Sequence, residues 1–346
     1  MRALAVRPGP RADRLPAPLR ITEHSLIQAV RAKLADTTLA RRPPLVPSGD
    51  DAAVVAADAL AVTSVDMMVE GVHFELAPGW ASPADVGHRA LAAALSDIAA
   101  MGSRAGEAYI ALGLPARVTD DEVLELVDGA GELARRCGVT IAGGDIVAAP
   151  ALTVCVTAVG WSSREVSPVT RAGARAGDIV GVTGRLGGPA GALELLAAGR
   201  EPGPELLARL RRPEPRLAAG AAVAAAGAHA MIDVSDGLAA DASLLGRASG
   251  VRLRIELERL PLLPAAADAA AALGRDGALL AAESGEEFEL CICAAAADAD
   301  AVAGAAADAG GPEVTWIGEV RAGDGGADLA ARDGTLVAAR GYEHRV

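Results

Sequence analysis

Short acidic segments interrupt the apolar runs of this chain at five places, and this recurrence is the strongest constraint on how it can fold. Burying a carboxylate without a partner is costly, so the folded chain must offer these side chains water, a base or a bound cation. A turn alone would account for Ser48-Gly49-Asp50, because these residue types favour turns. It would not account for the whole set, which comprises Asp50 with Asp51, then Asp66, Asp97 and Asp145, and finally Asp233 with Asp236.

The composition indicates a substantial core and argues against nucleic-acid and membrane partners. The chain has 346 residues and a formal net charge of −13, whereas a nucleic-acid surface requires a basic stripe. No run reaches the ~20 uninterrupted apolar residues of a membrane span. Residues 1–20 lack the apolar core of a signal peptide, so we expect a disordered tail and a cytoplasmic protein. The four cysteines lack zinc-site spacing and are interpreted as buried thiols.

Strand-like and helix-like segments alternate along both halves of the chain, which predicts an α/β (α+β) fold with mixed sheets. Strands of the first half are predicted at 52–57 and 60–65, among others. The predicted helices cover residues 22–36, 82–101, 120–136, 189–198, 217–226, 238–248 and 294–309. We expect two lobes, an N-terminal one at 21–161 that binds metal and ATP, and a C-terminal one at 162–346.

The helix predicted to begin at Ser82-Pro83 carries Asp97 on an unusual face. Leu91, Leu95 and Ile98 form its apolar stripe, while Asp97 shares another stripe with small residues. A solvent-exposed face would carry Lys, Glu or Arg there, whereas small residues permit close packing. No basic residue lies on that stripe, so a metal ion is the simplest source of compensating charge.

The acidic segments together favour Mg²⁺, because hard oxygen ligands without a Cys or His cluster suit Mg²⁺ better than zinc. The segments other than that of Asp97 stand at the ends of apolar strands, where ligands collect in α/β proteins. For any single aspartate, a turn, a helix cap or a solvated strand end is the simpler interpretation. The five segments together favour metal binding.

The usual lysine-dependent phosphate cradles are absent from the sequence. Lys33 is the only lysine, and there is no G-x-x-x-x-G-K-[ST] loop and no kinase H-R-D motif. A nucleotide enzyme of this composition would depend on metal ions, arginines and helix N-termini for phosphate binding. The segment TGRLGGPAG has the character of a phosphate-binding loop, and Asp236-Gly237 precedes a predicted helix.

Taken in order, a set of short motifs resembles the thiamine-monophosphate kinase family of the aminoimidazole ribonucleotide synthetase superfamily. The motifs extend from residue 24 to residue 344 and are GDDAAVV, SVDMMVEGVHF, RALAAALSDIAAMG, GGD, VTRAGARAGD, MIDVSDGL, SGEEFELC, WIGEV and GYEH. Each is weak alone, and the ordered set is specific. The resemblance implies a homodimer of two-lobed subunits whose N-terminal sheets meet. It also implies phosphorylation of thiamine monophosphate by ATP.

The resemblance assigns roles to individual residues by motif position. The implied Mg²⁺ ligands are Asp51, Ser64, Asp66, Asp97, Asp145, Asp233 and Asp236, with the backbone carbonyl of Val65. The implied ATP contacts are Gly144, Arg171 and Ser235, and the implied contacts to the thiamine substrate are His73 and Glu286. Asp66, Asp97 and Asp145 are the expected catalytic residues. Their role is positioning and charge neutralisation, because the acceptor phosphate is already ionised near neutral pH and needs no general base.

The chain departs from the family's usual residues at several motifs. It has Val65 in place of Thr, Ala94 in place of Asn, Ile146 in place of Thr, Glu287 in place of Asp, and Ala339 in place of an aromatic residue. Phe74, Trp80 or Tyr342 are candidates to replace the missing ring. Three alternatives therefore stay open: another ATP-using enzyme of the superfamily, a non-catalytic protein that binds nucleotide or thiamine phosphate, and a metal-dependent phosphohydrolase. Selenophosphate synthesis would require a reactive residue near the N-terminus, and no cysteine precedes Cys137.

Overall fold

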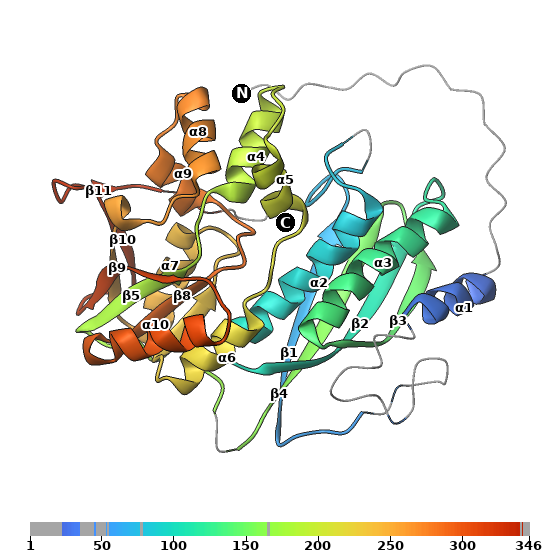
Figure 1. The fold of residues 1–346 in the computed structure, drawn as a ribbon, viewed down its shortest axis with the longest axis horizontal. Helices are drawn as coiled ribbons and strands as arrows, with labels where there is room; N and C mark the ends of the chain where they lie inside the picture. Colours follow the sequence, from blue (N-terminus) through green and yellow to red (C-terminus); the bar gives the residue numbers. More distant parts are fainter. Residues whose placement is uncertain are drawn as a thin grey trace.

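The structure, a computed structural model, describes residues 23–34, 45, 53, 55–76, 79–164, 167–339 and 341, and these form two lobes (Figure 1). The first lobe contains a four-stranded sheet in the order β1-β4-β2-β3. The second contains a seven-stranded sheet in the order β11-β10-β7-β9-β5-β8-β6. Both sheets mix parallel and antiparallel pairs, so the predicted α/β class is confirmed. The predicted tail at 1–20 lies outside the described residues.

The first lobe covers one face of its sheet with two long helices (Figure 1). β1 (Leu60–Val69) and β2 (Arg104–Leu114) pair antiparallel with β4 (Thr153–Ser162), and β3 (Thr140–Ala148) pairs parallel with β2. The covering helices are α2 (Pro83–Ala100) and α3 (Asp120–Cys137), and α1 (Glu23–Leu34) lies against α3. β1 alternates between side chains facing α2 and exposed ones, as the period of a strand requires.

The two covering helices approach each other through a glycine on each. A Cβ on Gly87 of α2 would lie 1.9 Å from the Leu126 carbonyl oxygen, and a Cβ on Gly129 of α3 would lie 1.9 Å from the Ala84 carbonyl oxygen. No side chain fits at either point. The predicted start of α2 is also correct, because the Ser82 hydroxyl accepts the Asp85 N–H at 3.2 Å.

The second lobe has helices on both faces of its sheet. Its strands are β5 (Asp178–Thr183), β6 (Ala230–Asp233), β7 (Arg252–Glu256), β8 (Leu290–Ala295), β9 (Val314–Arg321), β10 (Gly326–Ala330) and β11 (Leu336–Val337). Its helices are α4 (Gly188–Ala197), α5 (Pro204–Arg211), α6 (Leu217–Ala225), α7 (Leu238–Ser249), α8 (Pro264–Leu273), α9 (Gly277–Glu283) and α10 (Ala299–Asp308). α7 packs into the core on one face, while α6 and α10 pack into the core on the other.

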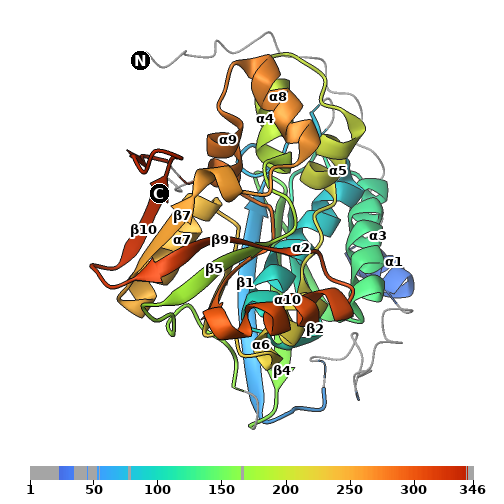
Figure 2. The ribbon, with the colours of Figure 1, turned by 60° about the vertical axis from the view of Figure 1, so that its left-hand side comes forward.

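The C-terminal end of α2 also belongs to the core of the second lobe. Ala99 and Ala100 pack in the same buried cluster as Val223 of α6 and Met231 of β6. A Cβ on Gly220 of α6 would lie only 2.2 Å from the Ala99 carbonyl oxygen. Figure 2 shows α2 beside α6 at the junction of the lobes. The helix is therefore enclosed by both lobes.

Some elements differ from those predicted. The segment 294–309 is not one helix, because Ala294 and Ala295 complete the β8 ladder with β5 and α10 begins only at Ala299. Pairing with a neighbouring strand overrides the helix propensity of alanine here. Of the predicted strand 52–57, the described residues 53 and 55–57 are irregular. No helix among the described residues is long and apolar enough to cross a membrane.

His88 on α2 is fully buried at the junction of the lobes. The Pro213 carbonyl can only accept a hydrogen bond, so the Nε2–H donates to it at 2.8 Å. Nδ1 is buried and has no hydrogen-bond partner among the described residues. Burial, with the nearby Arg212 and Arg136 guanidinium groups, lowers the pKa of His88 from 6.5 to about 4.

We expect His88 to make the protein acid-sensitive between about pH 6.5 and pH 4. In this window the unfolded chain binds a proton that the folded chain excludes, so stability falls as the pH falls, by up to about 3 kcal/mol. A glutamine can donate to Pro213 without titrating. The melting temperature of His88→Gln should therefore fall less than that of the wild type from pH 7 to pH 4.5. Parallel melting curves for the two proteins would contradict this assignment.

Candidate functional site

Helix α2 reaches open space at only two points along most of its length. Of residues 85–100, all of which the structure describes, only Ala93 and Asp97 are not buried. They are four residues apart and so lie on one face. The small side chain of Ala93 leaves room beside the helix, and Asp97 projects from the same face. The sequence predicted close packing along this stripe, which holds for the buried Ala90 and Ala94 but not for Ala93 and Asp97.

Asp97 meets the side chains of β1 that point towards the helix. The Ser64 hydroxyl donates to an Asp97 carboxylate oxygen at 2.5 Å and lies 3.2 Å from an Asp66 carboxylate oxygen. Ser64 and Asp66 are two residues apart on a strand and share its inner face. The side chain of Val65 between them is 64% exposed on the opposite face. Only the backbone of Val65 is therefore available on this side.

The second lobe adds a third carboxylate, that of Asp233, and a positively charged side chain, that of Arg171, to this group. Asp233 at the end of β6 is buried and accepts a hydrogen bond from the Ser96 hydroxyl of α2 at 2.7 Å. Burial, followed by the Asp97 charge, raises the pKa of Asp233 to about 7, and Arg171 opposes this increase. Burial and the Asp97 charge likewise raise the pKa of Asp66 to about 6. We call Ser64, Asp66, Asp97 and Asp233 the carboxylate cluster.

The carboxylate cluster has the oxygen ligands that suit a magnesium ion, but it does not surround an ion completely. Its donors are oxygen atoms, and burial together with the Asp97 charge raises the pKa values of both Asp66 and Asp233. Among the described residues, no three His, Cys, Asp or Glu side chains are arranged to hold one ion. An ion here would have to complete its coordination with water or ligand oxygens, as Mg²⁺ commonly does.

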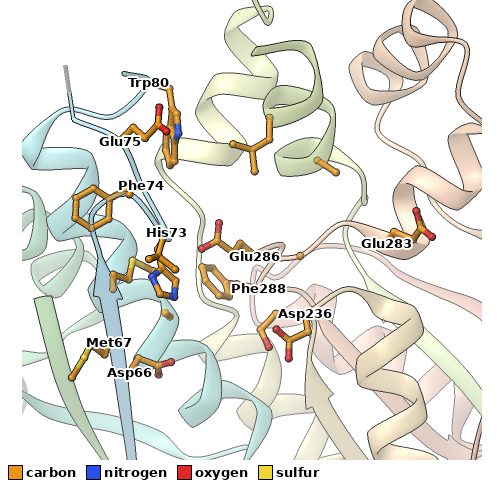
Figure 3. A pocket seen from close by; sticks show the side chains of 18 of the residues that line it. Asp66, Met67, His73, Phe74, Glu75, Trp80, Asp236, Glu283, Glu286 and Phe288 are labelled. Carbon is orange, nitrogen blue, oxygen red and sulfur yellow. The ribbon is translucent and has the colours of Figure 1, made fainter. Parts of the chain in front are cut away.

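A cavity of about 670 Å³ opens beside the carboxylate cluster, between the lobes (Figure 3). The first lobe contributes Asp66, His73, Phe74 and Trp80, and the second lobe contributes Ser235, Asp236, Glu286 and Phe288. We call this space the first cavity. It brings the predicted substrate contacts His73 and Glu286 close to Asp66. Ser235, a predicted ATP contact, and Asp236, a predicted metal ligand, border the same cavity on the loop after β6.

The lining of the first cavity is acidic and aromatic. Six carboxylates line it, from Asp66, Glu75, Glu194, Asp236, Glu283 and Glu286, whereas no Lys or Arg does so among the described residues. The chain contains only two phenylalanines, and both border this cavity together with one of its three tryptophans. Arg89 pairs with Glu286, and Arg275 pairs with Glu194 and Glu283, so this negative charge is partly neutralised. The remaining charge and the aromatic rings favour a flat, positively charged ligand.

The backbone holds the side chains of the first cavity in place. The Val69 N–H donates to His73 Nδ1 at 3.1 Å, so a neutral His73 ring carries its proton on Nε2. The Glu286 N–H donates to the Ser235 carbonyl at 2.7 Å, which joins two loops of the second lobe. Glu286 has a φ of 55°, a left-handed conformation that is unusual for a residue other than glycine.

Asp241, which the sequence analysis did not identify, orders the loop that carries Ser235 and Asp236. It is buried in the first turn of α7, and one carboxylate oxygen accepts the N–H groups of Ser235 and Asp236, each at 3.0 Å. Burial, followed by the charges of Asp233 and Asp236, raises the pKa of Asp241 to about 8. The spacing of Asp241 after the SDG segment, at a helix start, was the available signal.

A second cavity of about 610 Å³ lies on the other side of Asp97. Its lining includes Ser64, Val65, Asp97, Thr170 and Arg171. Asp66 borders the first cavity, whereas Ser64 and Asp97 border the second. The carboxylate cluster thus stands between two cavities, each large enough for a small molecule.

Gly144 and Asp145 lie apart from the carboxylate cluster, in a third cavity of about 620 Å³ between α1 and β3. Strand register aligns Asp145 with Ala111, Cys155 and then Met67 across the sheet. Asp145 therefore belongs to the face opposite α2, three strand spacings or about 14 Å from β1. Gly144 packs against β2, where a Cβ would lie 1.9 Å from the Ile110 carbonyl oxygen. Asp51 lies outside the described residues.

The residues at which the chain departs from its family's usual pattern have mostly structural surroundings. Ala94 is buried in the first-lobe core, and Ile146 packs against the same core. Glu287 is buried and accepts the Gly187 N–H at 2.5 Å, which anchors the start of α4. Ala339 packs against the second-lobe core. Of the candidate replacement rings, Trp80 and Phe74 border the first cavity, and Tyr342 lies outside the described residues.

Comparison with known proteins agrees with this architecture. Residues 49–162 match the family "AIR synthase related protein, N-terminal domain", and residues 175–329 match its C-terminal domain. The thiamine-monophosphate kinase of Mycobacterium tuberculosis (strain ATCC 25618 / H37Rv) is 44% identical over 241 residues, which cover 68% of this chain and 72% of the relative.

Solved structures of named thiamine-monophosphate kinases have the same fold. That of the Stenotrophomonas maltophilia K279a enzyme superposes with a TM-score of 0.78 at 35% identity, covering 92% of this chain and 98% of the other. The structure of AaThiL complexed with AMPPCP and TMP gives a TM-score of 0.73 at 28% identity, covering 93% and 97%. The chain therefore belongs to the thiamine-monophosphate kinase family, built from the two domains of AIR synthase related proteins.

Proposed function

We propose that this protein transfers the γ-phosphoryl group of ATP to the phosphate of thiamine monophosphate, producing thiamine diphosphate and ADP. The observation that carries the proposal is the carboxylate cluster between two cavities, because a direct transfer needs two ligands to meet at one point. The names of the relatives support both substrates, as does the related structure complexed with AMPPCP and TMP.

Thiamine monophosphate would occupy the first cavity. One of its two heteroaromatic rings, the thiazolium, is positively charged, which suits the acidic and aromatic lining. His73 and Glu286 would contact these rings, and the phosphate would lie towards Asp66. Since no Arg or Lys lines the cavity among the described residues, a phosphate there requires a cation from elsewhere.

The phosphates of ATP would lie in the second cavity, where the positively charged Arg171 side chain could bind them. Gly144 and Ser235 are the other proposed ATP contacts. Gly144 lies at the third cavity and Ser235 at the first, so only Arg171 of the three borders the second cavity.

The carboxylate cluster would hold Mg²⁺ between the two phosphorylated ligands. When bound, the metal supplies positive charge that opposes the repulsion of two phosphates, about 4 kcal/mol for unit charges ~4 Å apart at an effective dielectric of 20. Ser64, Asp66, Asp97, Asp233 and Asp236, with the Val65 carbonyl, are the proposed ligands at this site, and Asp51 and Asp145 complete the proposed set. These residues position and neutralise charge, because an ionised phosphate acceptor needs no general base.

The outer face of the four-stranded sheet would meet a second copy of the chain. Val65, Met67 and Val147 point outward from it and are 64%, 55% and 56% exposed. Asp145 shares this face and stands far from the carboxylate cluster of its own subunit. An apolar sheet face of this kind is typical of an oligomer interface, and a homodimer would bring Asp145 near a partner sheet.

Purified protein with Mg²⁺, ATP and thiamine monophosphate should form thiamine diphosphate and ADP in equal amounts, measured by chromatography. Formation should require both substrates. Phosphate release without thiamine monophosphate would instead identify a phosphohydrolase. Nucleotide binding without turnover would identify a non-catalytic protein, and turnover with a different acceptor would identify another enzyme of the superfamily.

We expect Asp66→Asn and Asp97→Asn to lower kcat at least about a hundredfold, because each removes one charged metal ligand. Mg²⁺ should raise the melting temperature of the wild type, and it should raise that of each variant much less. Asp308→Asn, an exposed change on α10, is the control and should behave as the wild type does. Wild-type kcat in either cluster variant would refute the assignment.

Sedimentation velocity should give twice the mass of one chain. Val147→Lys should produce monomers, because it places a charge on the outer face of the first-lobe sheet. Leu336→Lys, at an equally exposed apolar residue of β11 in the second lobe, should leave the dimer intact. A wild-type monomer, or an unchanged mass for Val147→Lys, would rule out this interface.

A further inference from the structure

Arg89 of α2 is fully buried and touches three parts of the first-cavity wall. Its Nη2 donates to a Glu286 carboxylate oxygen at 2.5 Å and to the His73 carbonyl at 3.3 Å. Its guanidinium lies over the Trp80 ring, 4.7 Å from the centroid. Its Nη1 donates to the Leu210 carbonyl at the end of α5. The Arg89 residue is 1% exposed, so these contacts replace water for both Nη atoms, while the buried Nε has no hydrogen-bond partner among the described residues.

The spacing along α2 relates this contact to the carboxylate cluster. Arg89, Ala93 and Asp97 follow each other at intervals of four residues and so share one side of the helix. Ala93 borders the first cavity between the two charged residues. With a rise of 1.5 Å per residue, Arg89 and Asp97 are separated by about 12 Å along the helix axis. Helix α2 therefore contacts Glu286 through Arg89 at one end of the first cavity and contributes Asp97 to the carboxylate cluster at the other.

The geometry at Glu286 requires an external support. The side chain is 26% exposed and its backbone has a φ of 55°, a conformation that a non-glycine residue adopts only when its surroundings enforce it. The ion pair to Arg89 fixes one carboxylate oxygen. A guanidinium directs its N–H groups along fixed directions, here to Glu286, His73 and Leu210, whereas a lysine ammonium has no such planar fork.

We propose that Arg89 is a positioning residue that sets the distance between the ring end and the phosphate end of the bound substrate. It holds the Glu286 carboxylate and the Trp80 ring against α2, while the carboxylate cluster, to which Asp97 on the same helix belongs, would bind the phosphate end through a cation. The substrate class is a flat cation joined to a phosphate across that span. This inference rests on the proposed function, because it assigns the phosphate to the carboxylate cluster.

The test compares Arg89→Lys with Arg216→Lys. Arg216 is the matched control, since it is a mostly buried arginine that pairs with the buried Glu289 and does not line the first cavity. Arg89→Lys should raise KM for thiamine monophosphate at least about tenfold and change KM for ATP less than about twofold. Arg216→Lys should lower the melting temperature and leave both KM values near those of the wild type. Equal rises in both KM values for Arg89→Lys would overturn the proposal.

A double variant separates positioning from general loss of stability. If Arg89 acts through Glu286, KM for thiamine monophosphate in Arg89→Lys/Glu286→Gln should be no higher than in the worse single variant. Multiplied effects would show that Arg89 acts independently of Glu286 and would overturn the proposal. Should Arg89→Lys fail to fold, Trp80→Leu replaces it, and the same selective rise in KM is expected because the ring that stacks on Arg89 is lost.

A binding measurement distinguishes failure of this inference from failure of the proposed function. Thiamine monophosphate added with Mg²⁺ should change the tryptophan fluorescence of the wild type, and Trp80→Phe should remove most of the change. Arg89→Lys should weaken this binding about tenfold even if the wild type has no kinase activity. Normal kinase activity with wild-type binding by Arg89→Lys would overturn the inference alone.

Discussion

Enclosure of α2 by both lobes is the constraint on which the rest of the structure depends. A helix buried on nearly all sides must find partners for every polar side chain that it carries. Most of these partners come from the second lobe or from the segment that leads into it. The pairs are Asp85 with Arg212, His88 with Pro213, Arg89 with Glu286, and Ser96 with Asp233. The same contacts therefore join the lobes and shape the site between them.

The carboxylate cluster is an unfavourable arrangement that the surrounding fold imposes. Asp66 and Asp233 have raised pKa values because burial and the Asp97 charge oppose their ionisation. A bound divalent cation would relieve this repulsion, so the repulsion between the carboxylates would contribute to metal affinity. Asp241 adds a further buried carboxylate behind the loop of Ser235 and Asp236. Under the proposed function, this negative charge would serve metal binding at the expense of stability.

The motifs placed most of the fold correctly because they report local physics. Ser82-Pro83 predicted the start of α2 correctly. The small residues around Asp97 predicted a closely packed face, and the structure buries Ala90 and Ala94 there but leaves Ala93 at the first cavity. Residues 294–309 were predicted wrongly, since strand pairing outweighs alanine's helix propensity there. Arg89 and Asp241 escaped prediction because each acts on a residue distant in sequence or through backbone N–H groups. Neither contact leaves a periodic pattern.

The sequence by itself determined the α/β class and the alternation of strands and helices in both halves of the chain. It also determined the residue types suited to a metal site with oxygen ligands alone. Only the tertiary structure decided which of those residues meet. It gathered Ser64, Asp66, Asp97 and Asp233 between two cavities and left Asp145 on the far face of the same sheet. The physical reason is that hydrophobic periodicity specifies which face of an element is buried, whereas strand order and lobe packing specify what it is buried against.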